Sequence, residues 1–272
     1  MAPVKNWRLV ISPSLNPYEN MAVDEAILNI HLKQKTPPTL RLYSWEPFGI
    51  SLGYFQDPEK VLHLERCAQE KLIFVRRFTG GEIIFHGNEL TYSVTFTEGQ
   101  LPLPSSVKES FRYLTSFILN AYCMMGLKPS YSCDNPPDAT ESSFCFASRE
   151  DYDIIINNRK IGGNAQRRIK GSVFQHGVIP LEIDRAKFTN FVREDLSGIE
   201  GKSVSLSEAL GRNIGFNELA GSLKKSFENV FGVSLIEGVL TKEETLLVEE
   251  LKETKYANPE WNFNRKKTIL VK

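Results

Sequence analysis

The stretch KLIFVRRFTGGEIIFHGNELTYSVTF, residues 71–96, constrains the fold more than any other part of this 272-residue chain. Its apolar segments are rich in β-branched and aromatic residues, and the last of them alternates between apolar and polar residues over 90–96. Both properties indicate β-strands. Because Gly80-Gly81 and Gly87-Asn88 interrupt the run, we predict three consecutive strands here.

Further strands are predicted on both sides of this stretch. The segments that indicate them are WRLVI (7–11), LRLYSW (40–45), GISLGYF (49–55), YDIII (152–156), RKIGG (159–163) and SVFQHGVIPLEI (172–183). Asn157-Asn158 separates YDIII from RKIGG, and asparagine tolerates the left-handed backbone that a tight turn requires. We therefore expect a hairpin that turns at this pair.

Helical periodicity is found before and after these strands. Residues 20–35 place apolar side chains at helical spacing, with Asn20 as the expected cap and Pro37-Pro38 as the stop. One more helix is expected over residues 58–71 and a longer one over 105–126.

The chain changes character after about residue 184, where helical patterns take over. Strands thus cluster first and helices dominate later, which favours an α+β fold over a doubly wound parallel sheet. We expect residues 1–200 to form the main domain and residues 201–272 to form a helical C-terminal extension packed on it.

Composition excludes several classes of function. The chain has 33 Lys plus Arg and 33 Asp plus Glu, whereas a general nucleic-acid binder usually has a basic excess. No signal peptide and no apolar run long enough to span a bilayer is found, so a cytoplasmic protein without a membrane partner is expected. The four cysteines form no C-x-x-C pair, so no metal site is predicted.

The segment RRFTGG, residues 76–81, is the first candidate binding element. Glycine lets a ligand approach the backbone closely, and Arg76 and Arg77 have the chemistry to bind a phosphate or a carboxylate. A solvated strand end with a tight turn explains the same residues. The segment matches neither the P-loop nor the dinucleotide-binding glycine pattern.

Two histidines occupy similar positions in the pattern. His86 and His176 each precede a glycine at the end of an apolar segment. Both are candidates to donate a hydrogen bond to a substrate in one cleft. The alternative is that each is a histidine satisfied by its neighbours at a strand end.

The stretch SSFCFASREDYDIIINNRKIGGNAQRR, residues 142–168, holds the candidate nucleophile. A cysteine reacts as a thiolate, and a nearby cation lowers its pKa from about 8.5. The expected hairpin carries Lys160 back toward the loop that holds Cys145 and Cys133. Spacing alone leaves either cysteine as a nucleophile or as a structural residue, and Lys160 as a cation partner or an exposed lysine.

The glycines after Lys160 have two readings as well. Residues 162–168, GGNAQRR, have the composition of a backbone nest for an anion. They also fit a bend in an edge strand.

These segments together resemble a known family. NMAVDEAIL, RRFTGGEIIFHGNELTYSVTF, KIGGNAQRRIKGSVFQHG and the late KYANPEWNF occur in the order found in the biotin/lipoate protein ligase superfamily. The resemblance covers about residues 7–264. SSFCF points to the cysteine-dependent octanoyltransferases, because lipoate ligases usually lack a cysteine there.

The resemblance implies an α+β fold with a mixed β-sheet core flanked by helices. It implies transfer of an octanoyl group from acyl carrier protein to the lysine of a lipoyl domain, such as the glycine-cleavage H protein or a dehydrogenase E2 subunit, with no cofactor. Cys145 would carry the acyl group as a thioester, and Lys160 would lower the pKa of its thiol. The residues implied to bind the substrate are Arg76, Arg77, Thr79, Gly80, Gly81, His86, Gly162, Gly163, Asn164, Gln166 and His176.

The sequence departs from the family pattern at three points. Ala147-Ser148 stands where a Pro-Ser pair is usual, Glu82 replaces a small or basic residue, and Gly87 replaces an aspartate. Two alternatives therefore stay open: an ATP-dependent lipoate or octanoate ligase, and an amidotransferase that moves octanoyl between lipoyl proteins.

Overall fold

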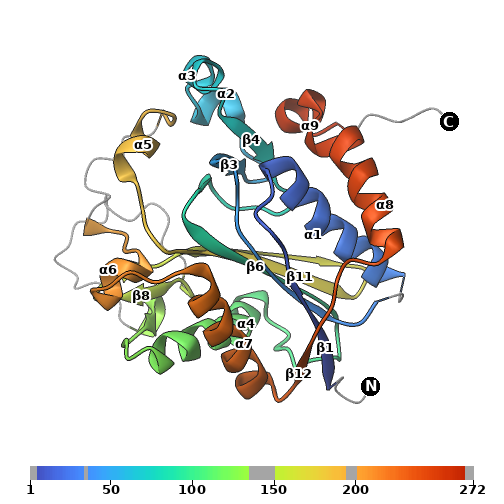
Figure 1. Ribbon diagram of the computed structural model, residues 1–272, viewed down its shortest axis with the longest axis vertical. Coiled ribbons are helices and arrows are strands. Elements are labelled where there is room, and N and C mark those ends of the chain that lie inside the picture. The colour runs from blue at the N-terminus through green and yellow to red at the C-terminus, as the bar shows by residue number, and fades with distance from the viewer. Residues whose placement is uncertain (1–4, 34–35, 135–150, 194–200, 267–272) are drawn as a thin grey trace.

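A six-stranded mixed sheet forms the centre of the protein, and helices cover both of its faces (Figure 1). The computed structural model describes residues 5–33, 36–134, 151–193 and 201–266. The strands, in order across the sheet, are β10 (Gly163–Ile169), β11 (Ser172–Pro180), β6 (Glu89–Thr97), β2 (Thr39–Tyr43), β1 (Asn6–Ile11) and β12 (Ser234–Glu237). Strand β1 runs parallel to both of its neighbours, and the other pairs are antiparallel. The predicted α+β class with a mixed sheet is confirmed.

Each face of the sheet has its own apolar core. The helices on one side are α1 (Pro17–Leu32), α8 (Lys242–Leu251) and the π-helix η4 (Lys252–Tyr256), and those on the other are α4 (Val107–Met124) and α7 (Phe216–Phe231). Trp7 of β1 packs on Phe227 of α7, with ring centroids 5.3 Å apart. Burial of such large side chains on both faces supplies the main drive for folding.

Two small sheets extend this core. One contains β4 (Ile73–Arg76), β3 (Gly49–Leu52) and β5 (Ile84–His86), and the other contains β7 (Ser130–Tyr131), β8 (Ile154–Ile156) and β9 (Arg159–Lys160). The short helices are α2 (Pro58–Val61), α3 (Leu64–Gln69), η1 (Ser132–Asp134), α5 (Arg185–Thr189), α6 (Leu206–Leu210) and α9 (Pro259–Asn264).

The three strands predicted within residues 71–96 are confirmed, but they belong to two sheets. Strands β4 and β5 flank β3, whereas β6 lies inside the large sheet. The hairpin predicted at Asn157-Asn158 is also confirmed, since φ is 50° and 60° at these residues. Residues 163–169 form edge strand β10, so the edge-strand alternative for the GGNAQRR segment holds.

Two details of the helix prediction are wrong. Asn16 caps α1, while Asn20 lies inside the helix and its amide donates to the carbonyl oxygens of Leu15 and Ser44. The helix expected over 58–71 is divided at Leu62-His63, because these two residues pair with Val192 and Phe191. One continuous helix would lose this antiparallel pairing between residues 62–63 and 191–192.

The chain after residue 200 is not entirely helical, because it also adds a strand to the large sheet. Its strand β12 pairs with β1 in parallel, and helix α8 packs on α1. Capping boxes of Ser205 with Glu208 and of Thr241 with Glu244 begin helices α6 and α8. The proposed boundary at residue 200 stays a prediction.

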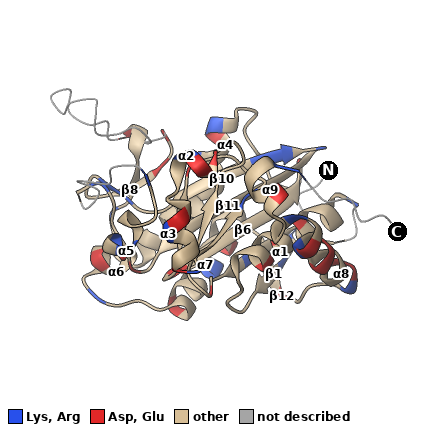
Figure 2. Cartoon of the chain, turned by 90° about the horizontal axis from the view of Figure 1, so that it is seen from above, with Lys and Arg blue, Asp and Glu red and all other residues tan. Residues whose placement is uncertain are grey.

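Acidic and basic residues lie side by side on α8 and are spread over many other elements (Figure 2). This distribution agrees with the equal numbers of positive and negative residues in the sequence. Among the described residues, no helix combines the length and the apolar character needed to cross a membrane.

Candidate active site

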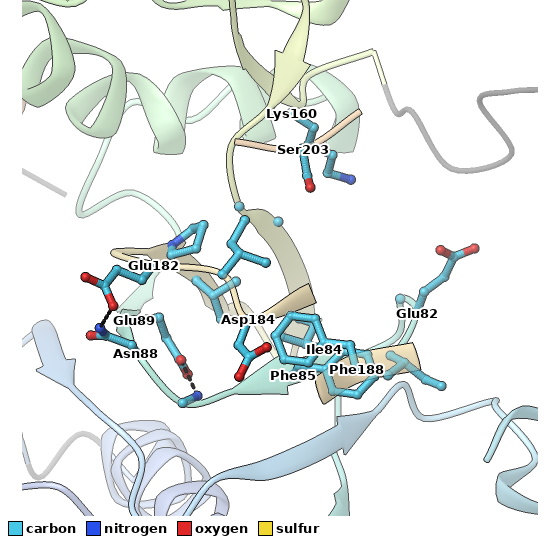
Figure 3. A pocket seen from close by; sticks show the side chains of 18 of the residues that line it. Glu82, Ile84, Phe85, Asn88, Glu89, Lys160, Glu182, Asp184, Phe188 and Ser203 are labelled. Carbon is cyan, nitrogen blue, oxygen red and sulfur yellow. Dashed lines mark hydrogen bonds between the residues drawn. The ribbon is translucent and has the colours of Figure 1, made fainter. Parts of the chain in front are cut away.

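A cavity of about 660 Å³ opens where the small sheet of β5, the hairpin of β8 and β9, the end of β11 and helix α5 meet (Figure 3). Lys160 and Ser203 lie on one side of it, and Ile84, Phe85 and Phe188 lie across from them. Six residues of the predicted site line this cavity: Arg77, Gly81, Lys160, Gly162, Gly163 and Asn164.

Lys160 reaches the cavity from the short strand β9. Its Nζ lies 2.7 Å from Oδ2 of Asp153, which also lines the cavity and is 9% exposed, against 30% for Lys160. The backbone of Lys160 pairs with the later chain as well, since its N–H donates to the carbonyl of Lys202 and its carbonyl accepts from the N–H of Val204. The structure therefore brings Lys160, the Asp153 carboxylate and residues 202–204 together at the cavity.

Cys145, the predicted nucleophile, lies outside the described residues. The described residues on either side of 135–150 are close together, because the N–H of Cys133 donates to the carbonyl of Asp151 at 2.9 Å. The N–H of Ser132 likewise donates to the carbonyl of Asp153. The alternative nucleophile Cys133 is exposed, and partial desolvation together with the neighbouring Asp134 carboxylate raises the pKa of its thiol.

The wall across from Lys160 is apolar. The rings of Phe85 and Phe188 stack with centroids 4.2 Å apart, and Phe48 lies within 6.4 Å of both. Phe85 comes from β5 and Phe188 from α5, so two elements far apart in sequence close this side. Sequence reasoning placed Phe85 in a strand but identified none of the three as part of the site.

One predicted glycine, Gly162, and one glycine of β11, Gly177, are required by close contacts. Gly162 has φ of +78°, and a Cβ there would lie 2.0 Å from the carbonyl oxygen of Val178. A Cβ on Gly177 would lie 2.1 Å from Oδ1 of Asn164. That same oxygen accepts a hydrogen bond from the hydroxyl of Tyr92 at 2.6 Å. The segment after Lys160 thus lies tightly against β11 and forms the cavity floor.

Arg77 shapes the turn that borders the cavity. Its guanidinium is buried and donates to the carbonyl oxygens of Ser51, Gly80 and Glu82. Burial lowers the pKa of Arg77 to about 10. Because these bonds fix both ends of the Gly80-Gly81 turn, the arginine sets the shape of the backbone that faces the cavity.

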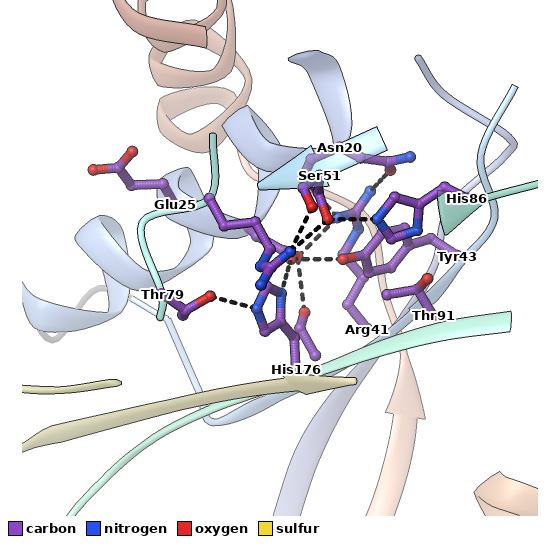
Figure 4. Close-up of polar contacts among 12 residues, drawn as sticks. Asn20, Glu25, Arg41, Tyr43, Ser51, Thr79, His86, Thr91 and His176 are labelled. Carbon is purple, nitrogen blue, oxygen red and sulfur yellow. Dashed lines mark hydrogen bonds and ion pairs between the residues drawn. The ribbon is translucent and has the colours of Figure 1, made fainter. Parts of the chain in front are cut away.

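The two candidate histidines lie in a buried network beside the cavity rather than in its open part (Figure 4). His86 contacts Oγ of Ser51 at 2.7 Å and Oε1 of Glu89 at 2.8 Å. His176 contacts the hydroxyl of Thr79 at 2.7 Å.

Burial lowers the pKa of both imidazoles, so both are neutral near pH 7. His86, His176 and Arg77 line a narrow second pocket behind the main one. The prediction of a shared cleft therefore holds only for this inner pocket.

Four predicted site residues line neither pocket. Thr79 contacts His176 and the carbonyl of Gly80 accepts from Arg77, whereas Arg76 and Gln166 are engaged elsewhere. Arg76 is enclosed by backbone carbonyl groups, including those of Gln56 at 2.6 Å and Asn262 at 2.7 Å, and so ties β4 to α9. Gln166 donates to the side chain of Gln175 at 3.0 Å. The structure does not bring these two side chains to the cavity.

Several residues that line the cavity were not identified from the sequence. Asp153 was part of YDIII, and its position diagonal to Lys160 across the hairpin was available from the predicted register. Ser203 comes from the tail, so no local pattern could place it beside Lys160. Among the described residues, no three His, Cys, Asp or Glu side chains gather to hold a metal ion.

Comparison with known proteins gives a consistent family. Residues 16–228 match the family described as the lipoyl protein ligase A/B catalytic domain. The chain is 36% identical to the octanoyltransferase LipM of Brevibacillus brevis, over 96% of this chain and 100% of that protein. It is 35% identical to the octanoyltransferase LipM of Bacillus subtilis, over 96% and 99%.

A solved structure shares the fold at lower identity. A bi-partite lipoate protein ligase from Thermoplasma acidophilum, described with its E2 lipoyl domain, superimposes with a TM-score of 0.79. It is 20% identical, and the match covers the whole of both chains. At this identity the likeness supports the fold alone.

Proposed function

Because the chain belongs to the lipoyl protein ligase A/B catalytic domain family, we propose that it moves an octanoyl group from octanoyl-acyl carrier protein to a lipoyl-domain lysine through Cys145. The acceptor would be a protein such as the glycine-cleavage H protein or a dehydrogenase E2 subunit. The observation that carries the transferase class is the near full-length similarity to octanoyltransferases. The roles of individual residues in the reaction are part of the proposal.

The reaction has two transfers and needs no ATP. The Cys145 thiolate attacks the thioester carbonyl of the donor, the carrier's thiol leaves with a proton, and a new thioester forms on Cys145. The neutral ε-amine of the acceptor lysine then attacks that thioester, an amide forms, and the Cys145 thiol is released. Thioester exchange is nearly isoenergetic and amide formation is downhill, so a ping-pong order follows.

Lys160 is the described residue best placed to assist. Its half-exposed ammonium lies at the cavity, on the side where the chain enters and leaves residues 135–150. A cation beside a cysteine favours the thiolate. The same charge would stabilise the oxyanion that develops on the acyl carbonyl during each transfer.

The apolar wall gives the octanoyl tail a place to bind. Phe48, Ile84, Phe85 and Phe188 line the cavity across from Lys160. Burying seven carbons at about 0.8 kcal/mol each contributes up to roughly 5 kcal/mol. That is enough for the cavity to prefer one chain length over another.

Intact-mass spectrometry tests the proposal. The protein is incubated with octanoyl-acyl carrier protein without ATP, and an octanoyl adduct is expected on the native protein and absent from Cys145→Ala. Cys133→Ala serves as the matched control and should retain the adduct, because it removes the neighbouring exposed thiol.

The ligase alternative predicts the opposite pattern. Under it no adduct would form, and octanoate or lipoate would drive ATP-dependent pyrophosphate exchange. That pair of results would replace the transferase with a ligase.

A further inference from the structure

Lys160 and Asp153 form an ion pair that differs from its neighbours in burial. The Asp153 carboxylate is 9% exposed and lies 2.7 Å from Nζ of Lys160. Two residues earlier in the chain, Asp151 pairs with Lys108 at 2.9 Å, but these side chains are 57% and 71% exposed. Exposed pairs contribute little because water screens them, whereas a pair at a partly enclosed cavity fixes its members more strongly.

The hairpin register explains how the carboxylate reaches the lysine. Ile155 of β8 pairs with Lys160 of β9, and the N–H of Ile161 donates to the carbonyl of Ile154. Asp153, directly before β8, therefore lies two residues from the partner of Lys160 and shares its face. This diagonal placement is within reach of a long side chain.

The backbone of both residues is fixed by other segments. The carbonyl of Asp153 accepts from the N–H of Ser132, and Lys160 pairs with Lys202 and Val204 on its other side. The Lys160 backbone is thus held between two segments. Its side chain still has a four-carbon stem that rotates about several bonds, so the position of the ammonium depends on what the Nζ contacts.

We propose that Asp153 is a positioning residue that holds the Lys160 ammonium at the cavity, so that octanoyl transfer slows when this carboxylate is removed. This inference rests on the proposed function, in which Lys160 assists the acyl transfers. Asp153 acts through Lys160 and need not touch the substrate.

The direct test is Asp153→Asn, assayed by the rate at which octanoyl-acyl carrier protein acylates the full-length protein. We expect the maximal rate to fall about tenfold, with the KM for the carrier little changed, because a reactive group that is misplaced slows the chemical step. Asp153→Glu keeps the carboxylate and should recover part of the rate. A general packing defect would not be rescued by that longer side chain.

Asp151→Asn is the matched control. It removes a carboxylate from the same segment and from a lysine pair of similar length, but that pair is exposed and away from the cavity. Its acylation rate should equal that of the native protein.

A double-mutant cycle distinguishes positioning from an independent role. If Asp153 acts through Lys160, Asp153→Asn should cause no further loss in a Lys160→Ala background. Equal losses in both backgrounds would overturn the inference, as would a native rate for Asp153→Asn. If Asp153→Asn melts far below the native protein, the same cycle is run with Asp153→Glu, whose rate must then depend on Lys160.

The outcome also separates this inference from the proposed function. Failure of the native protein to form a Cys145-dependent adduct would overturn both. A normal adduct on native protein, slowed by Lys160→Ala but not by Asp153→Asn, would overturn the positioning role alone.

Discussion

The protein holds two polar clusters close together that differ in what surrounds them. The buried network joins Asp24, Arg41, Tyr43 and His176, with Asp24 and Arg41 fully buried and 2.8 Å apart. The cavity cluster is centred on Lys160, which is 30% exposed. Both clusters contain residue types that serve in catalysis, but only the cavity cluster borders the open cavity.

The difference teaches that burial, rather than residue type, separates structural from reactive groups here. Asp24 accepts hydrogen bonds from Arg41, Tyr43 and Ser93. Burial raises the pKa of the Asp24 carboxyl, but Arg41 foremost, with His176 and Tyr43, outweighs burial, so that the pKa is lowered. Because its oxygens accept all of these hydrogen bonds, the Asp24 carboxylate stabilises the junction of α1 with the sheet. The buried network should therefore control stability, and the cavity cluster should control rate.

The largest expected effect is the loss of stability in Asp24→Asn. Removing one charge of a buried pair leaves the Arg41 cation uncompensated, which costs about 3–5 kcal/mol. Denaturant unfolding would measure the free energy of unfolding. The control Glu218→Gln breaks an exposed pair with Arg212 and should leave the free energy of unfolding nearly unchanged, because water screens exposed pairs. Equal effects of the two variants would contradict the comparison.

Lys160→Ala should show the opposite pattern to Asp24→Asn, with a large loss of rate and little loss of stability. We expect the rate of octanoyl transfer to fall about a hundredfold, as on removal of one group that stabilises an oxyanion, with little change in melting temperature. Lys224→Ala, which breaks a pair with Glu237 away from the cavity, provides the control in both assays. A Lys160→Ala protein that is fully active, or one that is inactive only because it is unfolded, would remove the distinction.

Phe188→Ala should alter chain-length preference rather than maximal rate. Loss of the ring that stacks on Phe85 opens room for about two methylene groups, which at about 0.8 kcal/mol each favours a longer acyl chain by roughly tenfold. Competing octanoyl and decanoyl carrier proteins would measure the ratio by mass spectrometry. An unchanged ratio would mean that the acyl chain binds elsewhere.

The smallest effect is a pH dependence of stability from the buried histidines. Burial lowers the pKa of His86 and His176, so below about pH 6.5 the unfolded chain binds protons that the folded chain does not. Stability should therefore fall as the pH drops from 7.5 to 5.5, each value being roughly one unit from that pKa. Melting temperatures across this range would show it, and the fall should be shallower in His176→Gln. A flat or rising profile would contradict the neutral state of these rings.

The sequence predicted what depends on local pattern. The strands of residues 71–96 and the turn at Asn157-Asn158 follow from alternation and from turn chemistry, and both are present. The sequence could not divide those strands between two sheets, because strand pairing is decided by contacts distant in the chain.

Site residues were harder to predict for the same reason. Arg76 and Arg77 are adjacent and chemically identical, yet one lies in a cage of carbonyl groups and the other borders the cavity. Only long-range packing distinguishes them, through Asn262 in one case and Ser51 in the other. The pair of Asp153 with Lys160 was within reach of the predicted hairpin register, since the two residues are diagonal neighbours.

The central claim is that this chain transfers octanoyl between proteins through an acyl intermediate. The most direct measurement is a single-turnover reaction in which octanoylated protein, freed of donor and of ATP, is mixed with an unmodified lipoyl domain. We expect octanoyl to disappear from the protein and to appear on the acceptor lysine at the same rate, in equal amount. An acceptor that gains octanoyl only when ATP and free octanoate are added would contradict the account.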